Sequence, residues 1–169
     1  MRVQDIMTKS PNVCTQATNL AAAASILWSA GCGALPVVDE KGNLVSVITD
    51  RDMCIALGTR NQKPADVTVA DVMQQHPVAC RASDDIHTAL YIMRTRKIRR
   101  LPVVDEHGKL EGVLCMTDLV LNACHDDGSA SRPELSYEDI MRTLICIYRH
   151  APAAERAVGQ AVGRLALKL

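Results

Sequence analysis

The sequence contains the same phrase twice. Residues 35–52 read LPVVDEKGNLVSVITDRD, and residues 101–118 read LPVVDEHGKLEGVLCMTD. Pro36 and Pro102 stand 66 residues apart, and this offset relates further pairs upstream: Val3 with Val69, Asp5 with Asp71, Met7 with Met73, Pro11 with Pro77, and Cys14 with Cys80. Two copies are too few for a solenoid, and halves of about 60 residues bury little apolar surface alone. The repeat therefore predicts two small α/β halves packed on each other.

Each copy of the phrase has the pattern of a β-hairpin followed by a helix. In the second copy, apolar residues fill 101–104 and 110–114, and Asp105 and Gly108 stand at the first and fourth turn positions between them. Asp118 then opens a short apolar segment, Leu119 to Cys124, whose length suits a helix. The repeating unit therefore ends with strand, turn, strand and helix.

A short strand and a helix are predicted before each hairpin. The strands, at 13–15 and 78–80, follow prolines that favour extended backbone. Thr18 and Ser83 are residue types that cap helices. Apolar residues then recur at helical spacing and predict one buried stripe per helix: Leu20, Ala23, Ala24 and Leu27, then Ile86, Ala89, Leu90 and Met93. Glycines 31 and 33 end the first helix, whereas the second runs without a glycine into basic residues.

Polar, turn-rich segments divide the chain. Residues 58–66 are predicted to link the repeats, and residues 125–133 follow the repeated part. Ser136 and Asp139 form a capping-box pattern for a tail helix to about Arg149, with one apolar stripe: Ile140, Met141, Leu144, Ile145 and Tyr148. A second stripe follows at Val158, Val162, Leu165 and Leu169. The predicted organisation is repeat 1 at 1–60, repeat 2 at 61–124, and a polar linker with C-terminal helices at 125–169.

Charge and cysteine content restrict the function classes. Lys plus Arg and Asp plus Glu number 19 each, so no net field draws the chain to nucleic acid or to an acidic membrane surface. The first residues lack a signal-peptide core, and no apolar run reaches the roughly 20 residues of a membrane span, so we expect a cytoplasmic protein. The seven cysteines form no Cys-x-x-Cys pair, and we expect free, mostly buried thiols. With one Trp, three Tyr and no Phe, a base-stacking surface is disfavoured.

Thr49 and Asp52 stand where the second strand of the first hairpin meets its helix, and two interpretations compete. As a cap, they would satisfy free N–H groups and oppose the helix dipole, stabilising the helix by roughly 1 kcal/mol. As a binding site, Asp52 and its counterpart Asp118 would each accept bonds from two adjacent hydroxyls, such as those of a ribose, because an ionised carboxylate is only an acceptor. Cys115 replaces Thr49 in the second copy and is a poor cap, so capping alone does not account for Asp118.

A basic cluster precedes the second LPVV strand. It consists of Arg94, Arg96, Lys97, Arg99 and Arg100, whereas Gly33 and Ala34 precede the first LPVV strand. Guanidinium groups can hold phosphate oxygens at two points, so the cluster is a candidate anion site. A solvated basic helix end is the alternative.

The DIM and DVM openings, the LPVVDE hairpins and a strand that ends in Thr-x-x-Asp resemble a CBS-domain pair, also called a Bateman module, over residues 1 to about 123. The resemblance implies an α/β (α+β) fold of two β-α-β-β-α repeats in pseudo-twofold symmetry, with ligand clefts between them. It also implies a non-catalytic regulatory module, often a homodimer. Such a module binds AMP, ADP, ATP or S-adenosylmethionine as a regulatory ligand and needs no obligatory cofactor.

The resemblance also assigns roles to residues. Asp52 and Asp118 match the ribose-binding aspartate, and the predicted ligand-binding set is Thr49, Arg51, Asp52, Arg99, Arg100, Cys115, Thr117 and Asp118. Gly33 and Ala34 depart from the basic pair that Arg99 and Arg100 match, and a thiol at residue 115 is a feeble donor. We therefore expect one good site and one poor site.

Two other function classes stay open. One is nucleic-acid binding through residues 94–100, and the other is a structural interaction module whose tail helices dock a protein partner. No Gly-x-Ser-x-Gly, Walker or His-Glu-x-x-His motif occurs, so we expect no catalysis. The groups at 124–127 and at Cys146 with His150 do not supply four convergent ligands, so we expect no metal site.

Overall fold

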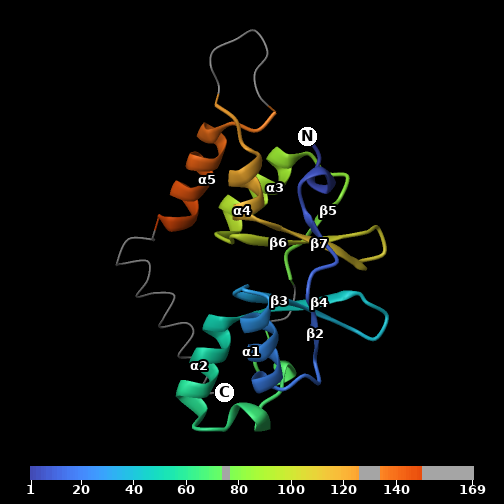
Figure 1. Cartoon of the computed structure of the whole chain (residues 1–169), viewed down its shortest axis with the longest axis vertical. Coiled ribbons are helices and arrows are strands. Elements are labelled where there is room, and N and C mark those ends of the chain that lie inside the picture. The colour runs from blue at the N-terminus through green and yellow to red at the C-terminus, as the bar shows by residue number, and fades with distance from the viewer. Residues whose placement is uncertain (74–76, 126–133, 150–169) are drawn as a thin grey trace.

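The two copies of the repeat fold into two halves, each a β-sheet covered by helices (Figure 1). The computed structural model describes residues 1–73, 77–125 and 134–149. The two sheets lie toward the middle of the molecule, with α3, α4 and α5 on the outer side of one and α1 and α2 on the outer side of the other. This mixed α/β architecture confirms the fold class predicted from the repeat.

The first half has a three-stranded sheet in the order β2-β3-β4. The first LPVV run forms β3, which pairs antiparallel with β4 and parallel with β2. The elements are β2 (Cys14–Thr15), α1 (Leu20–Ser29), β3 (Ala34–Val38), β4 (Leu44–Thr49), α2 (Asp50–Arg60) and a 3₁₀ helix (Pro64–Asp66). The α1 stripe packs on the face of the sheet that the helices cover, in one core formed mainly by Leu20, Ala23, Leu27, Leu35, Val37 and Ile48.

The second half has a four-stranded sheet in the order β1-β7-β6-β5. The elements are β1 (Thr8–Lys9), β5 (Cys80–Arg81), α3 (Ile86–Arg96), β6 (Arg100–Val104), β7 (Leu110–Cys115), α4 (Met116–Asn122) and α5 (Tyr137–Tyr148). The predicted α3 stripe is fully confirmed, because all four of its residues are buried against the sheet: Ile86, Ala89, Leu90 and Met93.

The two halves exchange their opening segments, each of which contains a 3₁₀ helix, Val3–Asp5 or Val69–Asp71. Val3 donates to the carbonyl of Asp84 at 3.0 Å, and Val69 donates to the carbonyl of Thr18 at 2.8 Å. Val3 is buried in the core of the second half and Val69 in that of the first. Val69 stands 66 residues after Val3, and Asp84 stands 66 residues after Thr18, so the two bonds are equivalent under the repeat. The two halves therefore pack with pseudo-twofold symmetry.

The hairpin turns form a second reciprocal contact. The N–H of Leu44 donates to Gly108, and the N–H of Leu110 donates to Gly42, both at 3.0 Å. Gly42 and Gly108 have φ of 84° and 86°, a conformation that favours glycine. Each predicted turn therefore closes its own hairpin and also forms a hydrogen bond with the other hairpin.

The helix starts differ slightly from the prediction. Asn19 rather than Thr18 caps α1, and Asp85 rather than Ser83 caps α3. In each case a side-chain oxygen accepts a bond from a first-turn N–H, at 2.8 and 2.9 Å. Ala24, which was assigned to the α1 stripe, is exposed, because the core contacts only the side of α1 that carries Ala23.

The helix ends differ as well. α2 continues through Gly58 to Arg60, so the link between the repeats is shorter than predicted. α3 stops after Arg96 because Lys97 adopts left-handed backbone with φ of 54°. A lysine therefore ends this helix where glycine is the usual residue.

The tail helix α5 confirms the predicted cap but not the predicted face. The Ser136 hydroxyl donates to Asp139 Oδ2 at 2.6 Å, and the Asp139 N–H donates back to that hydroxyl at 3.2 Å. α5 packs mainly on α3 and buries Ile140, Thr143 and Ile147. Met141, Ile145 and Tyr148, expected on the buried side, are exposed. The stripe predicted at 158–169 lies outside the described residues.

The thiols are free, as expected, but most of them are not buried. Only Cys14 and Cys80 lie in the core, where burial raises their pKa to about 11 and about 12. Cys54, Cys124 and Cys146 are exposed because their helices or loops turn these positions to solvent. Within the described ranges, no helix combines the length and apolar character of a membrane span.

Candidate ligand site between the repeats

Thr49 and Asp52 form a capping box at the start of α2. The Thr49 hydroxyl donates to Asp52 Oδ2 at 2.6 Å, and the Thr49 N–H donates to the same oxygen at 3.0 Å. The N–H of Asp52 donates to the Thr49 hydroxyl at 3.2 Å. The cap interpretation is therefore correct for this pair. These bonds use only Oδ2, so capping leaves a role for Oδ1.

Asp118 caps α4 without a hydroxyl partner. Its Oδ2 accepts from the N–H of Cys115 at 2.7 Å, so α4 begins at Met116, before the predicted start at Leu119. Asp118 caps its helix although Cys115 is a poor capping residue, because the aspartate bonds to a backbone N–H that every residue but proline supplies. Both aspartates are therefore held in the same orientation at equivalent helix starts.

Strand pairing brings the residues before each LPVV run next to these turns. Ala34 pairs with Thr49 across β3 and β4, and Arg100 pairs with Cys115 across β6 and β7. The Arg100 side chain is half-buried. The sheet thus places one guanidinium beside the Asp118 turn, whereas the equivalent place beside Asp52 holds an alanine.

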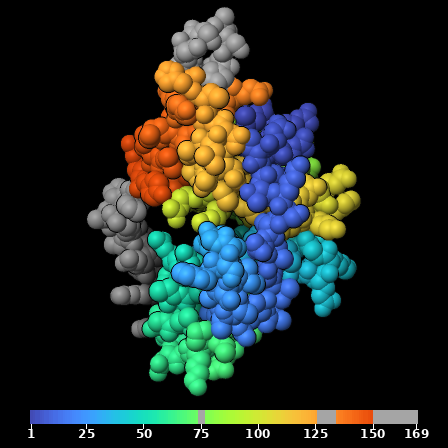
Figure 2. Space-filling view, in the orientation of Figure 1, coloured from blue at the N-terminus to red at the C-terminus, as the bar shows by residue number. Residues whose placement is uncertain are grey.

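Arg100 reaches across to the first repeat. A Cβ atom on Gly33 would lie 3.3 Å from Arg100 Nη2 and 3.0 Å from Asp50 Oδ2. The guanidinium of the second repeat therefore lies close to the start of α2, the helix that carries Asp52. We call the group formed by Gly33, Thr49, Asp50, Asp52, Arg100, Cys115 and Asp118 the inter-repeat site. Figure 2 shows a recess on the surface between the two halves, between the orange atoms of the second and the blue atoms of the first.

Charged groups around the Cys115 thiol affect its pKa. Burial raises the pKa of this thiol, and the Asp118 carboxylate raises it further, while the Arg100 guanidinium lowers it. Cys32 of the first repeat also raises the pKa of Cys115, so groups from both repeats surround the thiol. The site therefore combines one cation, several carboxylates and the Cys115 thiol.

Not every predicted residue joins this group. Arg51 and Thr117 are exposed in the first turns of α2 and α4. Arg99 is exposed and its Nη1 donates to the hydroxyl of Tyr148 on α5 at 3.1 Å. The two arginines of the basic pair thus serve different neighbours, and Arg100 is the one at the inter-repeat site.

Asp50 is the site residue that sequence reasoning missed. Its Oδ1 accepts from the N–H of Arg51 at 2.7 Å, while Oδ2 lies beside Gly33. The equivalent position in the second repeat is Met116, so the 66-residue repeat does not mark Asp50. The lack of a side chain at Gly33 was the only local indication of a close approach.

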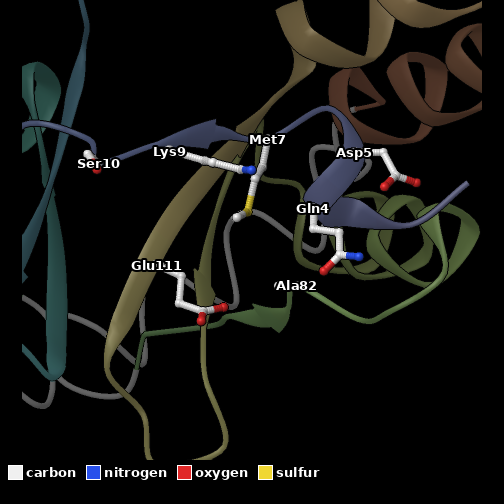
Figure 3. Close-up of a pocket in the computed structure, with 7 residues that line it drawn as sticks. All are labelled: Gln4, Asp5, Met7, Lys9, Ser10, Ala82 and Glu111. Atoms are coloured by element: carbon white, nitrogen blue, oxygen red, sulfur yellow. The ribbon is translucent and has the colours of Figure 1, made fainter.

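A separate open pocket lies on the second half, with a volume of about 820 Å³ (Figure 3). The opening segment, β1 and β7 supply most of its lining, which consists of Gln4, Asp5, Met7, Lys9, Ser10, Ala82 and Glu111. None of the predicted ligand-binding residues lines it. The pocket therefore does not coincide with the inter-repeat site.

Comparisons with known proteins agree with this architecture. The family model described as CBS domain matches residues 3–59 and 69–123. CBS domain-containing protein YhcV of Bacillus subtilis (strain 168) is 32% identical over 140 residues, which cover 82% of this chain and 97% of that protein. Other curated relatives are longer, and the chain spans only 46% or 22% of some of them.

Solved structures give the same result. CBSX2 in complex with AMP is 32% identical with a TM-score of 0.63, covering 71% of this chain and 93% of CBSX2, a protein from Arabidopsis thaliana. The CBS domain pair of protein MJ0100, in complex with 5'-methylthioadenosine and S-adenosyl-L-methionine, is 28% identical with a TM-score of 0.63, covering 72% of this chain and 98% of that one. The chain is a member of the CBS-domain family and carries two CBS domains in tandem.

Proposed function

We propose that the chain is a non-catalytic regulatory module that binds an adenosine-containing ligand at the inter-repeat site. The candidate ligands are AMP, ADP, ATP and S-adenosylmethionine. The observation that carries the proposal is the approach of Arg100 to Gly33, which puts a phosphate donor from one repeat beside the aspartate-bearing helix of the other.

Each side chain has a distinct task in this proposal. The capping bonds orient Asp52 and Asp118 through Oδ2, and Oδ1 of either residue can accept bonds from the two hydroxyls of a ribose. Arg100 can hold phosphate oxygens through two N–H groups. Asp50 adds negative charge near that guanidinium and disfavours ligands with many phosphate groups.

The relatives support an adenosine ligand. CBSX2 was solved with AMP, and the MJ0100 domain pair was solved with 5'-methylthioadenosine and S-adenosyl-L-methionine. These ligands share the adenosine group and differ in charge. The ribose carboxylates therefore account for what they have in common, and Arg100 is the residue that selects for an anionic group in this chain.

Titration calorimetry with AMP, adenosine and S-adenosylmethionine tests the proposal. Asp52→Asn keeps a capping oxygen but removes the charge, so AMP binding should weaken by roughly 1.5 to 3 kcal/mol while the fold persists. Asp66→Asn, at an exposed aspartate of the 3₁₀ helix Pro64–Asp66, is the matched control. Unchanged affinity in a folded Asp52→Asn protein would restrict Asp52 to its capping role, and the same change in Asp118 then tests the second repeat.

The AMP to adenosine affinity ratio tests Arg100 separately. Arg100→Met should lower this ratio because a phosphate would lose its bidentate partner. Arg96→Met removes the same charge from the last turn of α3 and should leave the ratio unchanged. If Arg100→Met keeps the wild-type ratio, the basic cluster does not read the phosphate, and nucleic-acid binding would be tested by salt-dependent titration with oligonucleotides.

We also propose a cytoplasmic homodimer. Trp28 is 89% exposed on α1, Leu121 is 77% exposed on α4, and Ile55 is 58% exposed on α2. Exposed apolar helix residues of this kind favour association with a twofold partner. Light scattering at micromolar concentration should give a dimer mass, and a monomer mass with or without AMP would contradict this proposal.

The exposed apolar face of α5 is where a protein target would dock, and it comprises Tyr137, Met141, Ile145 and Tyr148.

A further inference from the structure

The loop between α3 and β6 holds the C-terminal end of α5. Lys97 Nζ donates to the carbonyl oxygen of Arg149 at 2.9 Å, and Arg99 Nη1 donates to the Tyr148 hydroxyl at 3.1 Å. The Arg99 guanidinium also lies 5.9 Å from the centre of the Tyr148 ring. Two basic residues of one short loop therefore fasten the tail helix to the second repeat.

The same loop supports the inter-repeat site. The carbonyl oxygen of Arg99 accepts from the N–H of Met116 at 2.9 Å, and Met116 is the first residue of α4, next to Cys115. The following residue, Arg100, pairs with Cys115 and reaches Gly33. Arg99 thus contacts α5 through its side chain and the start of α4 through its carbonyl.

The backbone of this loop needs support. Lys97 has φ of 54°, in the left-handed region that residues with a side chain disfavour. Such a conformation persists where surrounding contacts hold it. Two backbone bonds to the Met93 carbonyl hold this turn, one from Lys97 and one from Ile98 at 3.0 Å. The bond from Lys97 Nζ to Arg149 adds to them, so a docked α5 further stabilises the loop shape that presents Arg100 to the inter-repeat site.

We propose that docking of α5 and binding of the adenosine ligand are positively coupled, so that α5 is the helix that reports occupancy of the inter-repeat site. This inference rests on the proposed function. Both events select the same loop conformation, and a coupling free energy is reciprocal. A ligand held by Arg100 should therefore make α5 open less often, and loss of the α5 contacts should weaken ligand binding.

Tyr148→Phe and Lys97→Met test the coupling in the full-length protein. Each removes one bond between α5 and the loop without altering a residue of the inter-repeat site. We expect AMP affinity, measured by titration calorimetry, to fall about fivefold in each variant. Hydrogen exchange of the α5 amides, followed by mass spectrometry, should slow when AMP saturates the wild-type protein and should slow less in the variants.

Two variants separate this coupling from general effects of charge and helix stability. Arg96→Met removes a positive charge from the basic cluster, and Arg142→Met breaks the pair between Arg142 and Glu138 within α5. Both should bind AMP like the wild-type protein.

Three outcomes would overturn the inference. Equal AMP affinity in wild type, Tyr148→Phe and Lys97→Met, with α5 exchange insensitive to AMP, would remove the coupling but keep the proposed function. Tighter AMP binding in Tyr148→Phe would reverse its sign and also overturn it. Failure of the wild-type protein to bind any adenosine ligand would overturn the proposed function, and the coupling with it.

Discussion

Arg100 of the second repeat lies so close to Gly33 of the first that a Cβ atom at residue 33 would stand 3.3 Å from its Nη2 atom. The same Cβ would lie 3.0 Å from Asp50 Oδ2. Both atoms end side chains that can move, so Gly33→Ala should still fold. The added methyl group should displace the guanidinium and weaken AMP binding roughly tenfold, or about 1.4 kcal/mol, in a calorimetric titration.

Gly58→Ala is the matched control for this change. Gly58 lies inside α2, and a Cβ there would meet nothing within 4 Å. Alanine should stabilise the helix by about 0.5 to 1 kcal/mol and leave AMP binding unchanged. If Gly33→Ala also binds AMP like the wild type, Arg100 does not hold the phosphate in the position that this structure shows.

Gly112→Ala should destabilise the protein by about 1 to 3 kcal/mol. A Cβ at residue 112 would lie 2.8 Å from the carbonyl oxygen of Thr8 and 2.9 Å from Met7 Sδ, so β1 would have to move away from β7. Urea denaturation measures the loss, and Gly58→Ala, whose added methyl group has open space, should instead raise the midpoint. A denaturation midpoint equal to that of the wild type would show that the pairing of β1 with β7 adds nothing to stability.

The sequence was most informative where local chemistry and the repeat coincided. The LPVVDE hairpins, the α3 stripe and the Ser136 cap are short-range patterns, and all three appear in the structure. The exchange of opening segments could not be predicted, because Val3 and Val69 look alike in the sequence whichever core receives them. That choice depends on contacts between distant segments.

In the candidate site, too, the features that the repeat marks could be predicted and the contacts between distant segments could not. Asp52 and Asp118 could be paired by the offset, and the structure places both in equivalent capping turns. The separation of Arg99 from Arg100 could not be foreseen, because the partner of Arg99 is Tyr148 on the tail helix, which has no counterpart in the repeat. The face of α5 was misjudged for a related reason. An amphipathic stripe predicts a buried side, but only the neighbouring helix decides which edge of the stripe is covered.

Thiol labelling should follow burial rather than sequence position. Burial keeps the pKa of Cys14 at about 11 and that of Cys80 at about 12, so neither forms a thiolate near neutral pH. Iodoacetamide should therefore label the exposed residues Cys54, Cys124 and Cys146 in the folded protein, and Cys14 and Cys80 only after unfolding. Peptide mass spectrometry distinguishes the sites. Rapid labelling of Cys14 or Cys80 in native buffer would mean that the cores open readily.

Acid should weaken the two hairpin turns that join the halves. The Asn43 side chain, which donates to Asp39, lowers the pKa of that carboxyl, and the Lys109 N–H does the same for Asp105. A carboxyl group whose pKa is lower in the folded than in the unfolded chain stabilises the folded state above about pH 4. This contribution is lost as pH falls through the folded-state pKa of the group. We expect the urea midpoint to fall in that acid interval.

The double variant Asp39→Asn with Asp105→Asn tests this expectation. It should lower the midpoint at neutral pH and flatten its acid dependence, whereas Glu40→Gln, at an exposed carboxylate beside Asp39, should not. An acid dependence as steep in the double variant as in the wild type would assign the loss to other carboxylates, such as the capping residue Asp71, whose pKa is lowered first by the hydroxyl of Thr68.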